Sequence, residues 1–485
     1  MQLYNTLTRK KETFTPAKEG TVSLYSCGIT AYDYCHIGHA RSAAVFDVLV
    51  RYLVSLGYSV TFIRNFTDID DKIINKANQE GISWQNVVDT YIAAFHEDMD
   101  AIGIQRATFE PKATEHIDEM LALIQTLIEK RHAYATAEGD VYFRVRSFPG
   151  YGKLSGRSVD ELRSGARVVS GEEKEDPLDF ALWKSAKPGE PFWESPWGKG
   201  RPGWHIECSA MSEKYAPLPL DIHGGGQDLV FPHHENEIAQ SEAAFPGPFC
   251  NFWVHNGFVQ VDSEKMSKSL GNFRTIRDIL ANYLPETLRF FLLTRHYRSP
   301  IDFSYDAMDD AEKNLRRIYE TKLLAQEAHS RAKWSASPLP EAFVKEFAEQ
   351  EQAWQNAMDD DLNTAAAIGH INSLVRLLNR LAEDKTAGKS AGAKDLFARF
   401  NSKLEQWGAI LGLFQSDPAL FLNNLKLSRA GRKGLAIHMV EELMARRLAA
   451  RQAKEYALSD AIRDELLELG VIVKDTPKGA LWDIA

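Results

Sequence analysis

The first part of the chain alternates between strand-like and helix-like patterns of hydrophobic residues. Residues 22–27 are short and apolar-alternating and precede Gly28, which predicts a strand running into a loop. From residue 39, apolar side chains recur at three- and four-residue steps until Gly57, which is typical of an amphipathic helix. Residues 59–66 are rich in branched and aromatic side chains and predict a second strand. This order indicates a parallel sheet with helices on its faces.

The rest of the chain departs from this pattern in two places. Residues 114–203 are less regular. They contain a helical piece around 117–128 and a β-rich piece at 140–145, and are then crowded with Gly, Pro, Glu and Trp, so we expect an insertion that carries surface loops. Strand-like segments resume at 220–223 and 252–255. Beyond about residue 306 helical patterns dominate to about residue 414. Breaks fall at 335–340 and at 385–392, and the second is typical of a flexible loop.

The predicted fold class is α/β: a Rossmann-like, doubly wound parallel sheet with an insertion, followed by an all-helical domain and a small basic module. The length of 485 residues supports several domains, because single hydrophobic cores stop growing near about 250–300 residues. The expected domains are residues 1–113 with 204–305 (sheet domain), 114–203 (insertion), 306–425 (helical domain) and 426–485 (C-terminal module).

Composition restricts the class of protein further. The net charge of −10 argues against a generally basic nucleic-acid coat, although it allows a local basic face. Four cysteines cannot form a disulfide framework in so long a chain, so we expect free or metal-bound thiols in a reducing compartment, the cytoplasm. The N-terminus does not resemble a signal peptide and no apolar run reaches the length of a membrane span, so we set aside secretion and membrane insertion.

Two short motifs suit phosphate chemistry. His36-Ile-Gly-His39 lies where the first helix begins, and its histidines share a face beside free backbone N–H groups, with Gly38 admitting a flat ligand. Lys265-Met-Ser-Lys268-Ser has two ammonium groups that stabilise charge on a leaving pyrophosphate. A surface turn and a solvated lysine loop are the alternatives. Both motifs follow predicted strands, where ligands bind in doubly wound sheets.

Together these motifs match the two signatures of class I aminoacyl-tRNA synthetases. The chain most resembles the cysteinyl-tRNA synthetase family over essentially its whole length. The resemblance rests on Cys27-Gly-Ile-Thr-Ala-Tyr-Asp-Tyr-Cys-His-Ile-Gly-His39, Asn65-Phe-Thr-Asp-Ile-Asp-Asp-Lys72, Gly203-Trp-His-Ile-Glu-Cys-Ser-Ala-Met211 and His223-Gly-Gly-Gly-Gln-Asp-Leu-Val-Phe-Pro-His-His-Glu-Asn-Glu237. It implies activation of L-cysteine with ATP and Mg²⁺ to cysteinyl-adenylate, followed by transfer to the 3′-terminal ribose of tRNA(Cys).

A metal site is the third candidate feature. His233 and Glu237 are four residues apart in a helix that we expect to begin after Pro232, whereas His234 has no such partner. From the residues alone, packed core thiols remain ahead of a metal. The resemblance reverses this order and implies one Zn²⁺ bound by Cys27, Cys208, His233 and Glu237. We expect Zn²⁺ to select thiol over hydroxyl, since a pocket that relies on shape discriminates such analogues only about 100-fold.

Further site residues follow from the resemblance. His36, Gly38, His39, Lys265 and Lys268 would bind ATP or stabilise the transition state. Asp228 would hold the ATP ribose, although an ordinary turn aspartate is the alternative. Thr67 and His223 would hold the amino acid, and Trp204 would close over its side chain unless it is a core residue.

The helical domain and the basic module would bind tRNA. Arg446, Arg447, Arg451 and Lys454 are at helical spacings and can meet phosphates, although a solvated helix face explains them equally. Asp460 and Asp475 would read anticodon base edges and Trp482 would stack on a base, unless it packs inside the module.

Two rival functions remain open at this point. One is a ligase that joins activated cysteine to a small amine, and the other is a non-catalytic RNA-binding paralogue. The helical domain and basic module argue against the first, and the intact motifs argue against the second. Because heptads are absent, we expect a monomer.

Overall fold

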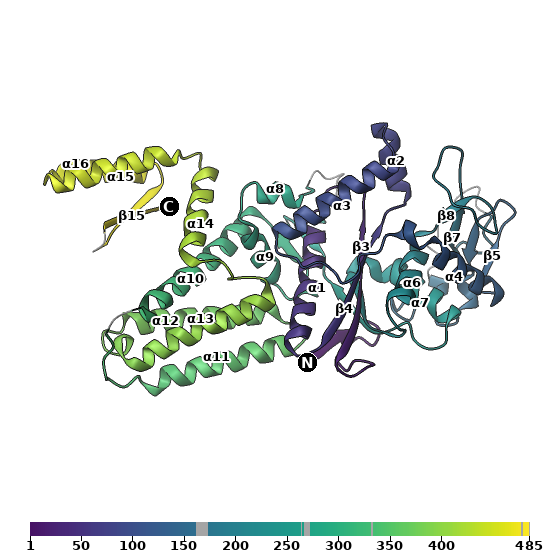
Figure 1. The fold of residues 1–485 in the computed structure, drawn as a ribbon, viewed down its shortest axis with the longest axis horizontal. Helices are drawn as coiled ribbons and strands as arrows, with labels where there is room; N and C mark the ends of the chain where they lie inside the picture. Colours follow the sequence, from purple (N-terminus) through teal and green to yellow (C-terminus); the bar gives the residue numbers. More distant parts are fainter. Residues whose placement is uncertain (162–172, 263, 266–271, 331–332, 477–478, 485) are drawn as a thin grey trace.

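The computed structural model describes the chain except residues 162–172, 263, 266–271, 331–332, 477–478 and 485. The molecule is elongated, with the sheet β3–β4 near its middle, strands β5, β7 and β8 at one end and helices α15 and α16 at the other (Figure 1). Within the described ranges, no helix is both long enough and apolar enough to cross a membrane.

The predicted parallel sheet and its first crossover are confirmed. Strands β3 (Thr21–Thr30), β4 (Ser59–Thr67), β9 (Leu220–Gly226) and β10 (Cys250–Asn256) form a sheet in the order β10-β9-β3-β4, with every pair parallel. Helix α1 (Ile37–Ser55) connects β3 to β4. One detail was wrong: β3 continues past Gly28 instead of ending there. A Cβ at this glycine would lie 1.5 Å from the Asn65 carbonyl oxygen, so the strands approach closely at an irregularity between Ser26 and Ile29.

The two faces of the sheet carry different cores. Leu24, Phe62 and Ile222 point to the face that α1 covers. Tyr25 and its neighbours on the other face pack against helices α6 (Trp204–Tyr215) and α7 (Glu235–Ala244). Alternation along the strands therefore separates two helical layers, which meet at the carboxyl edge of the sheet.

The insertion contains the helix and one strand that its sequence predicted, together with strands that it did not indicate. Helix α4 (Ile117–Glu129) is followed by an antiparallel sheet β5-β6-β7-β8, which packs on it around buried Phe143 and Trp183. Its strands are Ala133–Ala135, Val141–Phe143, Phe180–Ser185 and Gly200–Pro202. Most are only three residues long, too short for an alternating pattern to emerge. Helix α4 and strand β6 confirm the helical and β-rich pieces predicted at 117–128 and 140–145, whereas strands β5, β7 and β8 were not predicted.

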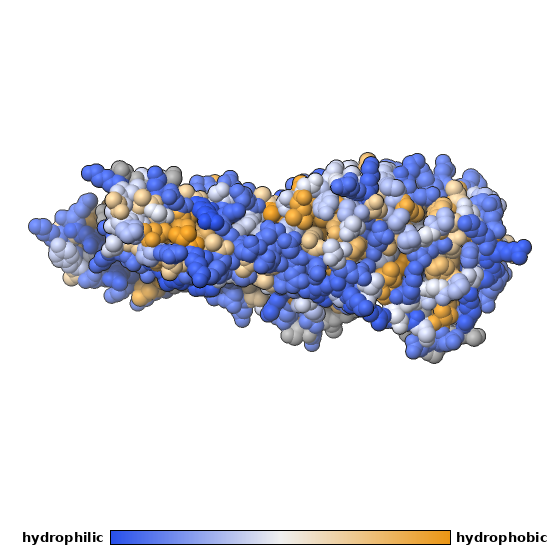
Figure 2. All heavy atoms as spheres, turned by 90° about the horizontal axis from the view of Figure 1, so that it is seen from below, coloured by the Kyte–Doolittle hydropathy of each residue, from blue (hydrophilic) through white to orange (hydrophobic). Residues whose placement is uncertain are grey.

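The C-terminal part is helical to about residue 414, as predicted, and it stays helical until its last hairpin. The helices are α10 (Tyr305–His329), α11 (Glu341–Asp359), α12 (Thr364–Glu383), α13 (Ala391–Leu411), α14 (Pro418–Arg432), α15 (Ile437–Gln452) and α16 (Tyr456–Glu468). The first predicted break, 335–340, lies between α10 and α11. The second, 385–392, covers the connection from α12 to α13 and the first two residues of α13. Strands β14 (Val471–Thr476) and β15 (Gly479–Ile484) pair antiparallel, which the helical pattern did not indicate. The face in Figure 2 is mostly hydrophilic, with hydrophobic residues in separate patches.

Candidate active site and metal centre

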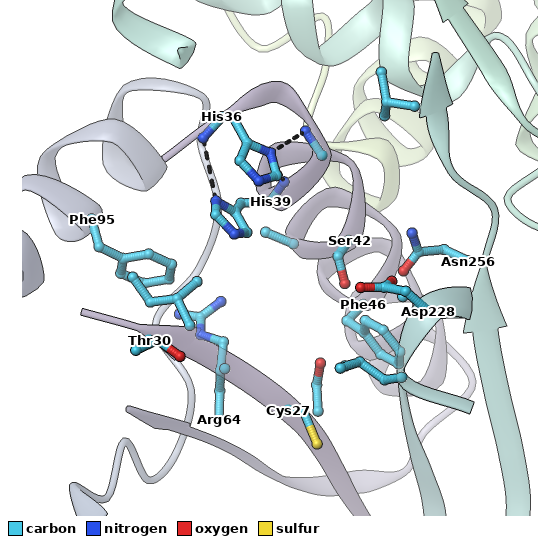
Figure 3. A pocket seen from close by; sticks show the side chains of 18 of the residues that line it. Cys27, Thr30, His36, His39, Ser42, Phe46, Arg64, Phe95, Asp228 and Asn256 are labelled. Carbon is cyan, nitrogen blue, oxygen red and sulfur yellow. Dashed lines mark hydrogen bonds between the residues drawn. The ribbon is translucent and has the colours of Figure 1, made fainter. Parts of the chain in front are cut away.

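A cavity of about 490 Å³ opens at the carboxyl edge of the parallel sheet. The N-terminus of α1 supplies His36, Gly38 and His39 to one wall, and Cys27 of β3 lies deep in it (Figure 3). Asp228 and Asn256 line the side formed by β9 and β10. The first signature motif and the ends of three parallel strands therefore share one space, as doubly wound sheets predict.

The two signature histidines are fixed by the helix they begin. His36 is the N-cap of α1, and its Nδ1 accepts hydrogen bonds from the backbone N–H of Gly38 at 3.0 Å and of His39 at 3.4 Å. His39 Nδ1 accepts in turn from the His36 backbone N–H at 3.3 Å, and the two rings stack 3.7 Å apart. Because both Nδ1 atoms accept, each neutral ring carries its proton on Nε2. Burial, with the charges of His36 and Lys72, holds the pKa of His39 well below its usual range.

Asp228 faces the cavity from a short turn after β9, Gln227–Leu229. A Cβ on Gly226 would lie 2.4 Å from the Asp228 carboxylate, so the glycine run makes room for this side chain. Asn256, at the end of β10, lines the same side, and the sequence patterns did not indicate it. Its position becomes apparent only once β10 is placed beside β9.

Three side chains from distant segments converge on Cys27 and form a group of four with it. The Sγ atoms of Cys27 and Cys208 are 3.7 Å apart, and Cys208 Sγ is 3.6 Å from His233 Nε2. Glu237 Oε1 lies 2.8 Å from His233 Nε2 and 3.5 Å from Cys27 Sγ. These residues come from β3, α6, the turn before α7 and α7 itself. The ligand set implied by the resemblance therefore forms one compact group.

The donor atoms fit a tetrahedral zinc site. Zn–S bonds of about 2.3 Å and Zn–N bonds of about 2.0 Å require sulfur atoms about 3.8 Å apart and sulfur–nitrogen separations of about 3.5 Å. The observed 3.7 and 3.6 Å agree with these values. The 2.8 Å between His233 Nε2 and Glu237 Oε1 is a hydrogen-bond distance and is shorter than the separation of about 3.3 Å between two ligands of one zinc ion. A second set, which replaces Cys208 and His233 by His223 and His234, is also compact, with Cys27 Sγ 3.6 and 3.3 Å from the two Nε2 atoms. The first set contains two thiols and is the softer of the two.

The neighbouring charges lower the pKa values of two side chains in the cluster, which favours the forms that bind a cation. Burial raises the pKa of Cys208, but the hydrogen bond from Cys27 and the charge of His233 outweigh it and lower the pKa to about 6. Burial likewise opposes a charge on Glu237, yet His223 and His233 hold its pKa well below the usual range. A thiolate and a carboxylate are thus both available to a divalent ion.

The chain is kinked just before α7. Phe231 has extended backbone angles (φ −143°, ψ 130°), whereas His234 is already helical and regular α7 runs from Glu235. The helix expected after Pro232 is therefore present, and His233 and Glu237 meet across one turn of it. In this turn His234 also points into the cluster, because its Nδ1 lies 2.8 Å from His255 Nε2 while its Nε2 approaches Cys27.

Trp204 and His205 support His233. The Trp204 ring stacks on His233 with centroids 4.1 Å apart and stays 38% exposed, so it is not a core tryptophan. His205 Nδ1 lies 2.9 Å from His233 Nδ1, and burial holds the pKa of His205 well below its usual range. Neutral His205 can therefore accept a hydrogen bond from the Nδ1–H group of His233, which leaves Nε2 of His233 available to a metal.

The other predicted amino-acid contacts lie deeper than expected. Thr67 is buried and donates to Glu207 at 2.6 Å. His223 stacks on Tyr25 at 5.0 Å, and its Nε2 is 2.9 Å from Glu237 Oε2. Neither Thr67 nor His223 is among the described residues that line the cavity.

The second signature motif is only partly described. Lys265 ends strand β12 (Glu264–Lys265), which pairs with β11 (Val259–Val261), the strand that follows β10 along the chain. Lys268 lies outside the described residues.

The C-terminal module holds its charges in internal pairs. Asp475 of β14 accepts hydrogen bonds from Arg447 at 2.9 and 3.0 Å and pairs with Arg451 at 2.6 Å, contacts that keep the Asp475 pKa well below its usual range. Arg447 is only 3% exposed, so it does not present a free cation to phosphates. Asp460 is exposed on α16, and half-buried Trp482 lies beneath the Lys426 ammonium at 4.1 Å.

Comparison with known proteins defines the class first. The tRNA synthetases class I (C) catalytic domain matches residues 13–313, the DALR domain matches 353–415, and the cysteinyl-tRNA ligase anticodon binding domain matches 438–482. The methionyl-tRNA synthetase of Mycobacterium tuberculosis, solved with methionyl-adenylate, has the same fold, with a TM-score of 0.59, 14% identity and coverage of 86% of this chain and 94% of that one. The chain has the fold and the catalytic domain of the class I tRNA synthetases.

Curated relatives narrow the class to one family. The cysteine–tRNA ligase of Oleidesulfovibrio alaskensis is 66% identical over 485 residues, and that of Nitratidesulfovibrio vulgaris strain Miyazaki F is 65% identical over 484, each match covering 100% of both chains. The cysteine–tRNA ligase of Lawsonia intracellularis is 55% identical over its full length. The chain belongs to the cysteine–tRNA ligase family.

Proposed function

We propose that this chain activates L-cysteine with ATP and transfers the cysteinyl group to the 3′-terminal ribose of tRNA(Cys). The observation that carries the proposal is the position of Cys27, which contributes both to the cavity and to the donor cluster. A small thiol held at this end of the cavity would lie between the donor cluster and the signature histidines. Matches along the whole chain, anticodon domain included, favour this function over a small-amine ligase or an RNA-binding paralogue.

The proposed metal is one Zn²⁺ held by Cys27, Cys208, His233 and Glu237. The ion would expand from four to five ligands to bind the substrate sulfur as thiolate, for which a hydroxyl is a poor substitute. The stacked Trp204 would cover this end of the cavity, and His223 would orient Glu237. Thr67 would act on the amino acid through its bond to Glu207.

Activation would depend on positioning and charge stabilisation, because the mechanism requires no covalent enzyme nucleophile. His36 and His39 would donate Nε2–H to the ATP phosphates beside the backbone N–H of Gly38. Asp228 would accept from the ribose hydroxyls, and Lys265 and Lys268 would neutralise the leaving pyrophosphate, with Mg²⁺ bound to ATP.

For tRNA binding, we propose the domain division 1–113 with 204–305, 114–203, 306–425 and 426–485. The last module would bind the anticodon through exposed Arg451 and Asp460, with Asp475 and Trp482 shaping the surface. Each chain carries a complete donor cluster and both signature motifs, so the proposed active form is a monomer. A reducing cytoplasm would keep its cysteines as thiols.

Cysteine-dependent exchange of labelled pyrophosphate into ATP, followed by charging of tRNA(Cys), tests this function. Serine should support exchange at least about 100-fold less well than cysteine. Chelation should abolish exchange and added Zn²⁺ should restore it. Equal exchange with serine, or full activity after exhaustive chelation, would contradict the proposal.

A further inference from the structure

One wall of the cavity is used by neither signature motif. On the side away from Asp228 and Asn256, Figure 3 shows Thr30, Arg64 and Phe95 facing the cavity. Tyr32 and Lys72 line the same region. Two cations and two aromatic rings therefore lie beside the proposed ATP site without an assigned ligand.

Arg64 is the most constrained of these residues. It lies in β4 with a side chain only 6% exposed, and its Nη2 donates to Glu110 Oε1 at 2.7 Å. Its guanidinium is 5.0 Å from the centre of the Phe95 ring and 5.7 Å from that of Phe62. These rings hold the planar group in place and favour a positive charge there.

The hydrogen-bonding capacity of this guanidinium is largely unused. Among the described residues Glu110 is its one hydrogen-bond partner, and buried Nε has none. A guanidinium has five N–H donors, and leaving buried donors unpaired is costly. A residue kept only for the ion pair with Glu110 would not need to line the cavity. An anionic ligand at this wall would satisfy the remaining donors.

The reaction brings three kinds of anion into the cavity. The triphosphate is assigned to the start of α1, and the cysteine carboxylate is consumed when the adenylate forms. The remaining anion is the phosphodiester of the incoming tRNA end. Aromatic rings next to cations are typical of sites for unpaired nucleotides, and here Tyr32 lies 5.4 Å from the Lys72 ammonium while Phe95 lies against Arg64.

We propose that Arg64 binds the phosphate of the 3′-terminal nucleotide of the tRNA, with Phe95 and Tyr32 packing against its base or sugar. This site faces the signature histidines across the cavity, so a nucleotide there would present its ribose hydroxyl to the adenylate. The inference rests on the proposed function and assigns a residue to its second step.

Two half-reactions test the assignment. Arg64→Gln should slow single-turnover transfer from preformed adenylate to tRNA by about 10- to 100-fold, the effect of one charge-assisted hydrogen bond. The slowing of transfer should exceed any slowing of pyrophosphate exchange at least tenfold. Arg64→Lys keeps a positive charge opposite Glu110 and serves as the second variant. Its ratio of transfer rate to exchange rate should also fall, but by less than in Arg64→Gln.

Glu110→Gln is the matched control, because it weakens the same ion pair and leaves the guanidinium in place. Its ratio of transfer to exchange should equal that of the wild type. The assignment is overturned if Arg64→Gln slows exchange as much as transfer, if it slows neither, or if Glu110→Gln changes the ratio equally. Failure of the wild-type protein to charge tRNA would instead overturn the proposed function. The charging assay on the wild type is done first, so the two outcomes can be told apart.

Discussion

The donor cluster and the C-terminal module differ in how deeply their charged side chains are buried and in how these charges are paired. Cys208, His233 and Glu237 are at most 1% exposed and converge from separate elements on a point beside the cavity. In the module, the Arg451 and Asp475 side chains that form a pair are 42% and 46% exposed. The cluster is buried and its atoms can still bind a metal ion. The pair in the module is exposed, and its two charges neutralise each other.

This difference fits the sizes of the two ligands proposed above. A one-atom difference between thiol and hydroxyl is detected only where water is excluded and donors are fixed in advance. A tRNA anticodon offers many contacts, so exposed charged side chains are sufficient to bind it. Internal pairs such as Arg447–Asp475 would hold the strands and helices of the module in position. Substitutions in the cluster should therefore affect cysteine activation, and those in the module should affect charging alone.

The largest effect is expected from Cys208→Ser. Loss of one thiolate should release zinc and reduce cysteine-dependent exchange to background, because a serine hydroxyl is a poor zinc ligand. Elemental analysis and the exchange assay measure the two losses. Cys250→Ser, at a buried thiol outside the donor set, should retain the metal; an unchanged zinc content in Cys208→Ser would remove Cys208 from the site.

His36→Asn should have the next largest effect. Asparagine can still cap α1, but it lacks the Nε2 donor, so exchange should fall about 100-fold while the melting temperature hardly changes. His36→Ala should lose the cap as well, with about 1 kcal/mol of stability. Exchange at the wild-type rate in His36→Asn would limit this histidine to capping.

Asp475→Asn should separate the two regions. Weaker pairing with Arg447 and Arg451 should disturb the module and lower kcat/KM for tRNA about tenfold, while exchange stays within about twofold. Asp464→Asn makes the same charge change on exposed α16 and should leave both values unaltered. A comparable loss of exchange in Asp475→Asn would mean that the regions are not independent.

Trp204→Phe should give the smallest effect. Phenylalanine keeps an aromatic ring over His233 but covers less of it, so KM for cysteine should rise about threefold with kcat nearly constant. Steady-state exchange at varied cysteine concentration measures both. A larger fall in kcat than rise in KM would assign Trp204 to chemistry instead of to binding.

Local patterns predicted the parts of this molecule that depend on local interactions. Strand β4, helix α1 and the breaks between the C-terminal helices follow from periodicity and turn residues, and the signature histidines follow from their place at a helix start. Strand β6 was indicated by its local composition, but strands β5, β7 and β8 of the insertion and the C-terminal hairpin are held by pairing and packing that no local pattern contains.

The donor cluster shows the same limit. Spacing correctly brought His233 to Glu237, but the kink at Phe231 and the inward position of His234 depend on tertiary contacts such as the one with His255. Arg64 gave no local signal either, because its strand is buried and its relation to the cavity arises from the order of the sheet. Residues that act through distant partners required the structure.

An anomalous difference map at the zinc edge, from crystals grown with cysteine, tests the central claim most directly. The account predicts one peak about 2.3 Å from the Sγ atoms of Cys27 and Cys208, with the sulfur of the bound amino acid as a further ligand. A peak surrounded by Cys27, His223 and His234, or no peak at all, would contradict it.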